Sequence, residues 1–140
     1  MRVVLDANVF VSGAIQKGAS FRIVQRWLAG GDFEVIMCPE LLAEITDVLT
    51  ERPRIRKWID LAVAKDYINT ISTLVDLVDD PAPIDPATRD VHDDYLVALA
   101  REHSANFIVT GDKDLLEWED QRPPALTPAA FEELLDGPDN

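Results

Sequence analysis

Cysteine, histidine and glycine are scarce in this chain of 140 residues, and each shortage excludes a kind of site. Cys38 is the only cysteine, so an intrachain disulfide is excluded and a reducing cytoplasm is the expected location. His92 and His103 stand apart, which argues against a zinc cluster of cysteines and histidines. The glycines form no phosphate-binding loop. Long apolar runs are also lacking, because Asp6 interrupts the first one, so neither a signal peptide nor a membrane span is expected.

Positive charge is scarce as well, with 13 Lys and Arg against 26 Asp and Glu and a net charge of -13. The excess is local, because residues 1–70 hold nine of each sign while residues 71–140 hold four cations and 17 acids. A compact basic cluster stands out in the neutral half: Arg52, Arg54, Arg56 and Lys57. Such a chain can still hold a polyanion if metal ions neutralise part of the acid, although the acids can equally form a solvated surface.

The first apolar run, Val3 to Leu5, ends abruptly in Asp6, with Asn8 just beyond it. The run is too short and too β-branched for a helix, and it predicts a buried parallel strand. Ligands of open α/β sheets bind beyond the carboxyl ends of strands, so Asp6 is a candidate site residue. The alternative is that Asp6 only caps the helix that follows.

Short apolar runs alternate with amphipathic stretches along the rest of the chain, with no internal repeat and no long linker. Further strands are expected at residues 34–37, 74–78 and 107–109. Helices are expected at residues 8–16, 21–28, 39–51, 55–60, 65–73, 90–103 and 128–135. The prolines of residues 79–86 indicate a loop. This alternation predicts one α/β domain with a mostly parallel sheet.

Two expected strands end in an acid, Asp6 and Asp112, and both acids would open into one crevice if the strands are parallel neighbours. Asp90, Asp93 and Asp94 share a helix face, where acids can also simply favour the helix dipole. Spacing alone assigns the acidic stripe of residues 39–51 to solvent; its members are Glu40, Glu44, Asp47 and Glu51. Converging carboxylates require protons or cations, and all-oxygen ligands select Mg²⁺ or Mn²⁺. Ions held in this way can promote phosphodiester hydrolysis.

Four acidic motifs follow one another in the sequence, and a closing stretch comes after them. They are residues 6–13 (DANVFVSG), 41–54 (LLAEITDVLTERPR), 93–100 (DDYLVALA), 109–116 (VTGDKDLL) and 126–131 (LTPAAF). In this order, over nearly the whole chain, they resemble the motifs of PIN-domain nucleases. The nearest branch resembles the toxins of bacterial and archaeal toxin–antitoxin pairs, relatives of VapC.

The resemblance implies a PIN-like three-layer α/β/α fold with a central, mostly parallel sheet of about five strands. Residues 1–136 would form one domain and residues 137–140 a short frayed tail. The implied activity is that of a Mg²⁺- or Mn²⁺-dependent endoribonuclease, the toxin of a type II toxin–antitoxin pair. Its partners would be RNA and a cognate antitoxin protein, with a homodimer as a further option.

The resemblance also implies roles for individual residues. Catalysis would use four acids: Asp6, Glu44, Asp93 and Asp112. The metal would be held by Asp6, Asp93 and Asp112. Supporting positions would be Asn8, Thr110, Asp114 and Asp94, the last of which adjoins Asp93 and stays open as the ligand in its place. We expect the basic cluster to bind RNA, or alternatively to pair with nearby acids such as Glu51 and Asp60.

Two other functions are compatible with parts of the sequence. A PIN-like module used only for protein contacts would keep the acids as structural residues, but the presence of all four favours an enzyme. A phosphoacceptor domain of the receiver type needs an acid pair after the first strand and an Asp at the end of the third. The lone Asp6 and the lack of that third acid argue against it.

Overall fold

The structure, a computed structural model, describes the backbone of residues 1–82 and 91–137 and the side chains of these residues except 91–94. Its strands are β1 Arg2–Leu5, β2 Glu34–Met37, β3 Asp76–Leu77, β4 Phe107–Val109 and β5 Ala125–Leu126. Its α-helices are α1 Ala7–Ile15, α2 Ala19–Leu28, α3 Pro39–Glu51, α4 Leu61–Leu74, α5 Val91–Glu102, α6 Lys113–Leu116 and α7 Pro128–Asp136, and η1 Pro53–Lys57 is a 3₁₀ helix.

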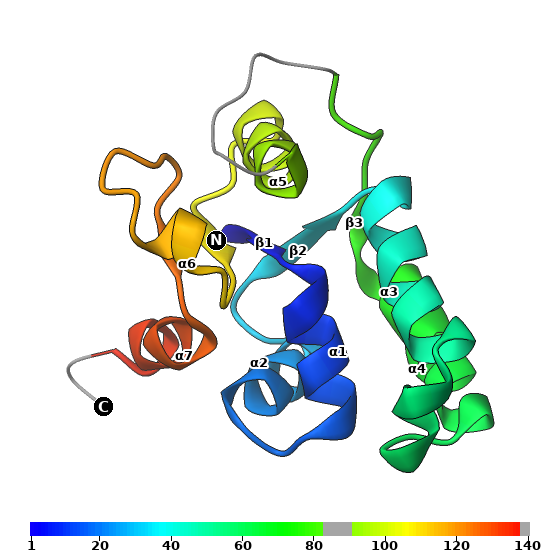
Figure 1. Cartoon of the computed structure of the whole chain (residues 1–140). Coiled ribbons are helices and arrows are strands. Elements are labelled where there is room, and N and C mark those ends of the chain that lie inside the picture. The colour runs from blue at the N-terminus through cyan, green and yellow to red at the C-terminus, as the bar shows by residue number, and fades with distance from the viewer. Residues whose placement is uncertain (83–90, 138–140) are drawn as a thin grey trace.

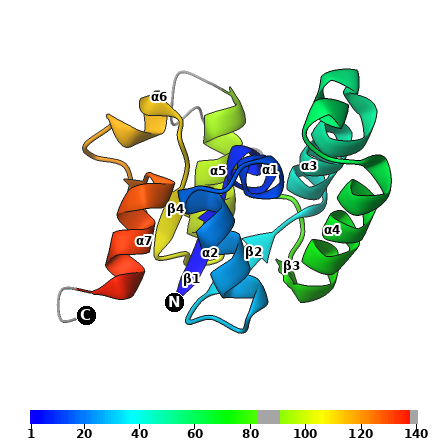
Figure 2. The ribbon, with the colours of Figure 1, turned by 90° about the horizontal axis from the view of Figure 1, so that it is seen from below.

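The five strands form one parallel sheet in the order β3-β2-β1-β4-β5, with β1 at its centre. Helix α5 covers one face, and α1, α2 and α7 lie on the other (Figure 1). Helices α3 and α4 pack against each other on the β2–β3 side, as the view from below also indicates (Figure 2). The predicted α/β fold with a parallel sheet of about five strands is confirmed.

The core explains why the inner strands read as unbroken apolar runs. Val3, Val4 and Leu5 are fully buried, because helices cover both faces of the sheet at β1. Phe131 of α7 lies edge-on to Phe33, with ring centroids 5.2 Å apart, and both rings are buried in the core. No helix among the described residues is long and apolar enough to cross a membrane.

The structure corrects several predicted boundaries. The helix expected at residues 55–60 is the shorter η1, which begins at Pro53, and α4 begins at Leu61 instead of residue 65. Exposed apolar side chains such as Val63, 55% exposed, hide the periodicity of α4. Strand β3 has only two residues, both exposed, because it lies at the sheet edge. Helix α6 was not predicted, since four residues are too few to show a period.

Candidate active site

The central acid, Asp6, directly follows β1 and is 1% exposed. It stands at the N-cap position of α1, yet its side chain makes no capping hydrogen bond there. Instead, Oδ2 accepts a hydrogen bond of 2.8 Å from the hydroxyl of Thr110. The alternative, that Asp6 only caps the helix that follows, is therefore wrong. A carboxylate buried at the end of a central strand and held by a buried hydroxyl is positioned for a site.

Strands β1 and β4 are parallel neighbours, as the site prediction required. Leu5 pairs with Val109, so that Asp6 and Thr110 come next on adjacent strands. The Thr110 hydroxyl donates to Asp6 and accepts the Asp112 N–H at 3.0 Å, and Thr110 is fully buried. This single hydroxyl therefore links the first acid to the backbone of the last. Its oxygen serves as donor and acceptor at once, as a hydroxyl can.

Asp112 and Asp114 form the next step of this hydrogen-bonded chain. Asp112 Oδ1 accepts the Asp114 N–H at 2.9 Å and caps α6. Both acids are partly buried. A short helix capped in this way fixes the turn after β4, so the Asp112 side chain stays at the carboxyl edge of the sheet.

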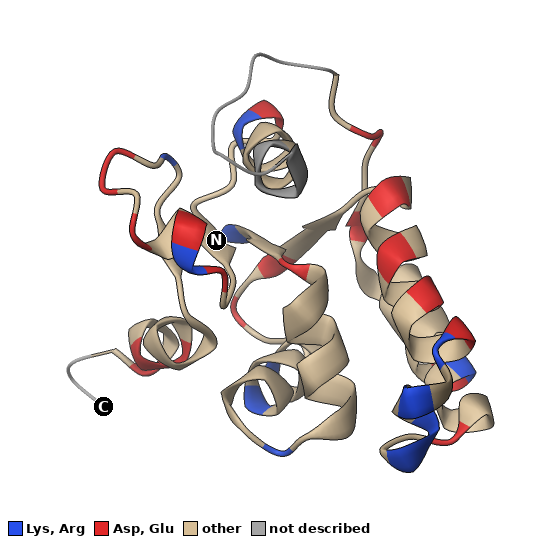
Figure 3. Cartoon of the chain, in the orientation of Figure 1, with Lys and Arg blue, Asp and Glu red and all other residues tan. Residues whose placement is uncertain are grey.

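Helix α3 carries Glu44 and packs against α1, the helix that Asp6 precedes. The acidic stripe divides by burial, since Glu44 is half-buried while Glu40, Asp47 and Glu51 are exposed. Figure 3 shows these acids along α3. Burial thus distinguishes Glu44 from its neighbours, where spacing could not. Asn8, in the first turn of α1, is exposed.

Asp93 and Asp94 lie in the first turn of α5, and their side chains are outside the described residues. The next residue, Tyr95, is described, and its hydroxyl lies 2.5 Å from the thiol of Cys38. Cys38 directly follows β2, so this contact brings the start of α5 to the carboxyl edge of the sheet, where Asp6 lies. The Tyr95–Cys38 pair was not predicted from the sequence, because the two residues are 57 positions apart and no local pattern indicates their contact.

Burial shapes the chemistry of the Tyr95–Cys38 pair. It raises the pKa of the Cys38 thiol above its ordinary value, and burial together with the thiol contact raises the pKa of Tyr95. The thiol therefore stays neutral at neutral pH and is a poor metal ligand. The pair therefore contributes packing next to the acids and not metal binding.

The described residues fit a hard divalent cation by the chemistry of their donors. Asp6 and Asp112, which the Thr110 hydroxyl links, offer only oxygen atoms at the edge, which suits Mg²⁺ or Mn²⁺. Among the side chains that the structure describes, no three from His, Cys, Asp or Glu come together as a metal site. Asp93 or Asp94 would have to complete the set from α5.

The four residues of the basic cluster differ in burial and in their contacts. Arg56 is half-buried, and its guanidinium donates to the backbone carbonyls of Leu49 and Ile59. Arg52 lies 3.7 Å from Asp47 but is 64% exposed, while Arg54 and Lys57 are exposed. Figure 3 shows these cations gathered beyond the end of α3. Three of the four are thus available to a polyanion, and Arg56 holds η1 against α3.

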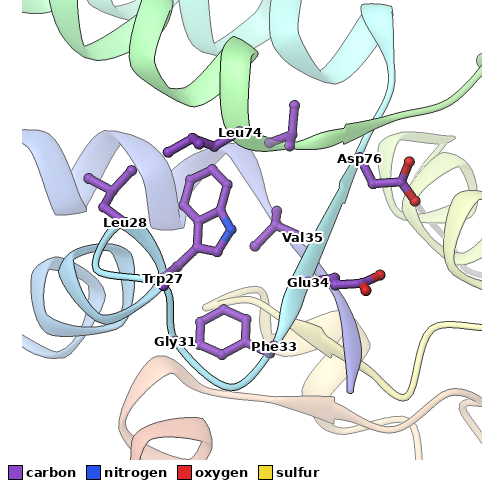
Figure 4. Close-up of a pocket in the computed structure, with 10 residues that line it drawn as sticks. Trp27, Leu28, Gly31, Phe33, Glu34, Val35, Leu74 and Asp76 are labelled. Atoms are coloured by element: carbon purple, nitrogen blue, oxygen red, sulfur yellow. The ribbon is translucent and has the colours of Figure 1, made fainter.

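A pocket of about 600 Å³ lies at the opposite edge of the sheet, where β2 and β3 begin. Figure 4 shows Trp27, Phe33 and Leu74 around it. Its acids Glu34 and Asp76 pair with Arg2 at 2.6 and 2.8 Å. These ion pairs account for both carboxylates, so this pocket adds no acid to the site at Asp6.

Comparisons with known proteins agree with this geometry. A family model described as PIN domain matches residues 2–114. No curated protein sequence matches the chain. A crystal structure of VapBC2 from Rickettsia felis bound to a promoter DNA fragment includes a similar chain, with TM-score 0.60, 10% identity, and coverage of 91% of this chain and 98% of that one.

A second similar structure is a domain of a functionally unknown protein from Methanocaldococcus jannaschii. Its TM-score is 0.54 at 17% identity, with coverage of 90% of this chain and 89% of that one. Both likenesses concern the fold. The family model covers most of the chain and includes Asp6, Glu44, Asp93 and Asp112. The chain therefore belongs to the PIN domain family.

Proposed function

We propose that this protein is a Mg²⁺- or Mn²⁺-dependent endoribonuclease that acts as the toxin of a type II toxin–antitoxin pair. The observation that carries the proposal is the buried Asp6 carboxylate, bound by the Thr110 hydroxyl that also accepts the Asp112 N–H. Membership of a family whose members are generally nucleases supports it.

Asp6 and Asp112 have the positioning role in this mechanism. Parallel register brings the ends of β1 and β4 together, and Thr110 restricts how the Asp6 side chain can rotate. With Asp93, or with Asp94 in its place, they would hold the divalent cation. That cation, when bound, supplies positive charge that offsets the clustered acids and stabilises charge on the reacting phosphate.

Glu44 is suited to handle the attacking water. Its half-buried position on α3, beside α1, separates it from the solvated acids of the same helix. A carboxylate there would orient the water for in-line attack on phosphorus and accept its proton. The leaving ribose oxygen then takes a proton from solvent, so that the strand is cut in two.

The proposed partners, an antitoxin and RNA, are inferred from the same family. The similar Rickettsia felis structure is of VapBC2 bound to a DNA fragment from their promoter. We propose a cognate antitoxin for this chain, and RNA as its substrate in the cytoplasm. A PIN-like protein-interaction module without strong catalysis is the alternative that an inactive but folded protein would favour.

The proposal is tested by cleavage of labelled single-stranded RNA with Mn²⁺, with Mg²⁺ and with a chelator. Asp6→Asn is expected to lower the rate at least about 100-fold, because one carboxylate of the metal set is lost. The fold should remain, since removing one like charge from the cluster relieves repulsion.

Asp32→Asn is the matched control, because Asp32 is an exposed acid 4.0 Å from Arg26 and lies outside the four motifs. Its rate should equal that of the wild type. Equal rates for Asp6→Asn and wild type in Mn²⁺, with both proteins folded, would refute the catalytic assignment.

A further inference from the structure

A second pocket, of about 540 Å³, lies at the end of α3, and none of the four proposed catalytic acids lines it. Its apolar wall includes Ile15 from the last turn of α1, Val48 from α3 and Ile55 from η1. Arg52, Arg54 and Trp58 also line it. We call this the Trp58 pocket. Its size is within the range of about 300–1,000 Å³ that suits small organic groups.

Trp58 is 62% exposed, which is high for the largest apolar side chain. Its backbone is nevertheless fixed, because its N–H donates to the carbonyl of Ile55 at 2.9 Å and the next residue, Ile59, is 7% exposed. Arg56 binds the carbonyls on both sides of this turn, at Leu49 and Ile59. The indole therefore projects from a fixed turn, and binding does not have to order the backbone that carries it.

The charge around Trp58 favours an anionic partner. Residues 52–58 contain four cations and no acid, in a chain whose net charge is -13. Glu51 lines the same pocket, and Asp47 lies 3.7 Å from Arg52, so these acids offset part of that charge. An aromatic plane beside cations is the arrangement with which proteins bind single strands, the base stacking on the ring and the phosphates contacting the cations.

The walls of the Trp58 pocket connect it with the proposed active site. Helix α1 starts after Asp6 and ends at Ile15, about 14 Å away at 1.5 Å per residue. On α3, Val48 lies about one turn after Glu44, so both residues are on the same side of the helix. Because α1 and α3 pack side by side, a strand bound at the acids can follow them to Trp58. This continuity favours the RNA substrate over an acidic protein segment.

We infer that the Trp58 pocket binds a base of the single-stranded RNA substrate, stacked on Trp58, with its phosphates contacted by Arg52 and Arg54. The inference rests on the proposed nuclease function. It adds a subsite that would select unpaired RNA, since a base within a duplex is not free to stack on a protein side chain.

The test uses the full chain and a labelled RNA hexamer, with a chelator present so that no strand is cut. Trp58→Ala is expected to weaken binding about tenfold, within the range for loss of one aromatic–base stack. Trp58→Phe should recover most of the affinity, because it keeps a ring. Leu61→Ala is the matched control, as Leu61 is apolar, 39% exposed and outside the pocket, and it should bind like the wild type.

A second probe separates bases from phosphates. A hexamer with the same sugar–phosphate chain but no bases should bind wild type and Trp58→Ala equally. If Trp58→Ala weakens both oligomers alike, or neither, the stacking inference is wrong. Loss of antitoxin binding in Trp58→Ala with unchanged RNA binding would also overturn it, in favour of a protein contact.

Cleavage kinetics distinguish this inference from the proposed function. With Mn²⁺, Trp58→Ala should raise KM about tenfold with little change in kcat, because Trp58 does not reach the reacting phosphate. A wild type that cuts no RNA, but whose RNA binding still depends on Trp58, would refute the nuclease and support the base pocket. A wild type that cuts RNA with a KM unchanged by Trp58→Ala would overturn the pocket and leave the nuclease intact.

Discussion

At the scale of single residues, Thr110 decides how the acids are arranged. Its hydroxyl is fully buried and joins Asp6 to the Asp112 backbone. The family resemblance gave Thr110 only a supporting place, and the structure specifies what it supports. A side chain that fixes two site residues at once is expected to affect activity without touching the substrate.

Thr110→Val keeps the shape of the side chain but removes this hydroxyl. The Asp112 N–H and Asp6 Oδ2 then lose a partner, so the free energy of unfolding should fall by about 1–3 kcal/mol. Mn²⁺ affinity or cleavage should fall about 10- to 100-fold, as for other residues that orient ligands. Calorimetry with Mn²⁺ and a cleavage assay measure both effects.

Thr110→Ser is the matched control, because it keeps the hydroxyl and loses one methyl group. It should stay within a few-fold of the wild type in Mn²⁺ affinity. Equal Mn²⁺ affinity and activity for the Val variant would mean that the hydroxyl only stabilises the fold.

Burial of one thiol and two tyrosine hydroxyls is expected to make the free energy of unfolding fall at alkaline pH. Burial raises the pKa of Tyr67, which donates to the Phe10 carbonyl at 2.7 Å, and raises those of Cys38 and Tyr95. The unfolded chain therefore loses these protons at a lower pH than the folded one. Stability is fully present below pH 9.0, the ordinary thiol pKa, and is lost as the pH rises above it.

Urea unfolding at about pH 8 and about pH 11 measures this loss, which reaches up to about 1.4 kcal/mol per pH unit for each group. Tyr67→Phe should be less stable at both pH values, because it loses a hydrogen bond, but its decline with pH should be shallower. A decline as steep as that of the wild type would contradict the assignment to Tyr67.

At the scale of elements, the local sequence predicted most of the helix and strand boundaries correctly. Strand 34–37 and helix 39–51 lie where the sequence indicated, because Pro39 opens the helix and Arg52 precedes Pro53. The cap of α3 could not be predicted. The Glu40 N–H is bound at 2.8 Å by Asp80, which lies 40 residues later and comes near only through the sheet.

The four cations in and just before η1 have different roles. Arg52, Arg54 and Lys57 are exposed, whereas Arg56 binds two backbone carbonyls. Replacing the three exposed cations with Gln should weaken RNA binding and flatten its salt dependence by up to about 2, at roughly 0.7 per phosphate contact. Fluorescence binding across a salt series gives the slope.

Arg56→Gln is the informative comparison within the same element. It should lower thermal stability, because the Leu49 and Ile59 carbonyls lose a charged donor, and should change the salt slope by less than one contact. An unchanged salt slope in the triple variant would mean that these cations do not contact the RNA phosphates and that RNA binds to another surface.

At the scale of the whole molecule, the parallel sheet is what brings distant acids together. Asp6 and Asp112 are 106 positions apart in sequence and follow neighbouring strands. The sequence predicted this meeting because both acids follow short buried runs. It could not separate Glu44 from its stripe, since Glu44 differs from the other acids in burial and not in spacing. The side chains of Asp93 and Asp94, at the start of α5, are outside the described residues, so the assignment of Asp93 as the metal ligand stays a prediction.

The most direct test of the central claim is anomalous X-ray diffraction from crystals of this protein soaked in Mn²⁺. The account predicts a manganese peak at the carboxyl edge of the sheet, in contact with Asp6, Asp112 and one acid of α5, and no such peak in Asp6→Asn crystals. A fully soaked wild-type crystal with no peak at Asp6, or with the same peak in Asp6→Asn, would contradict the account.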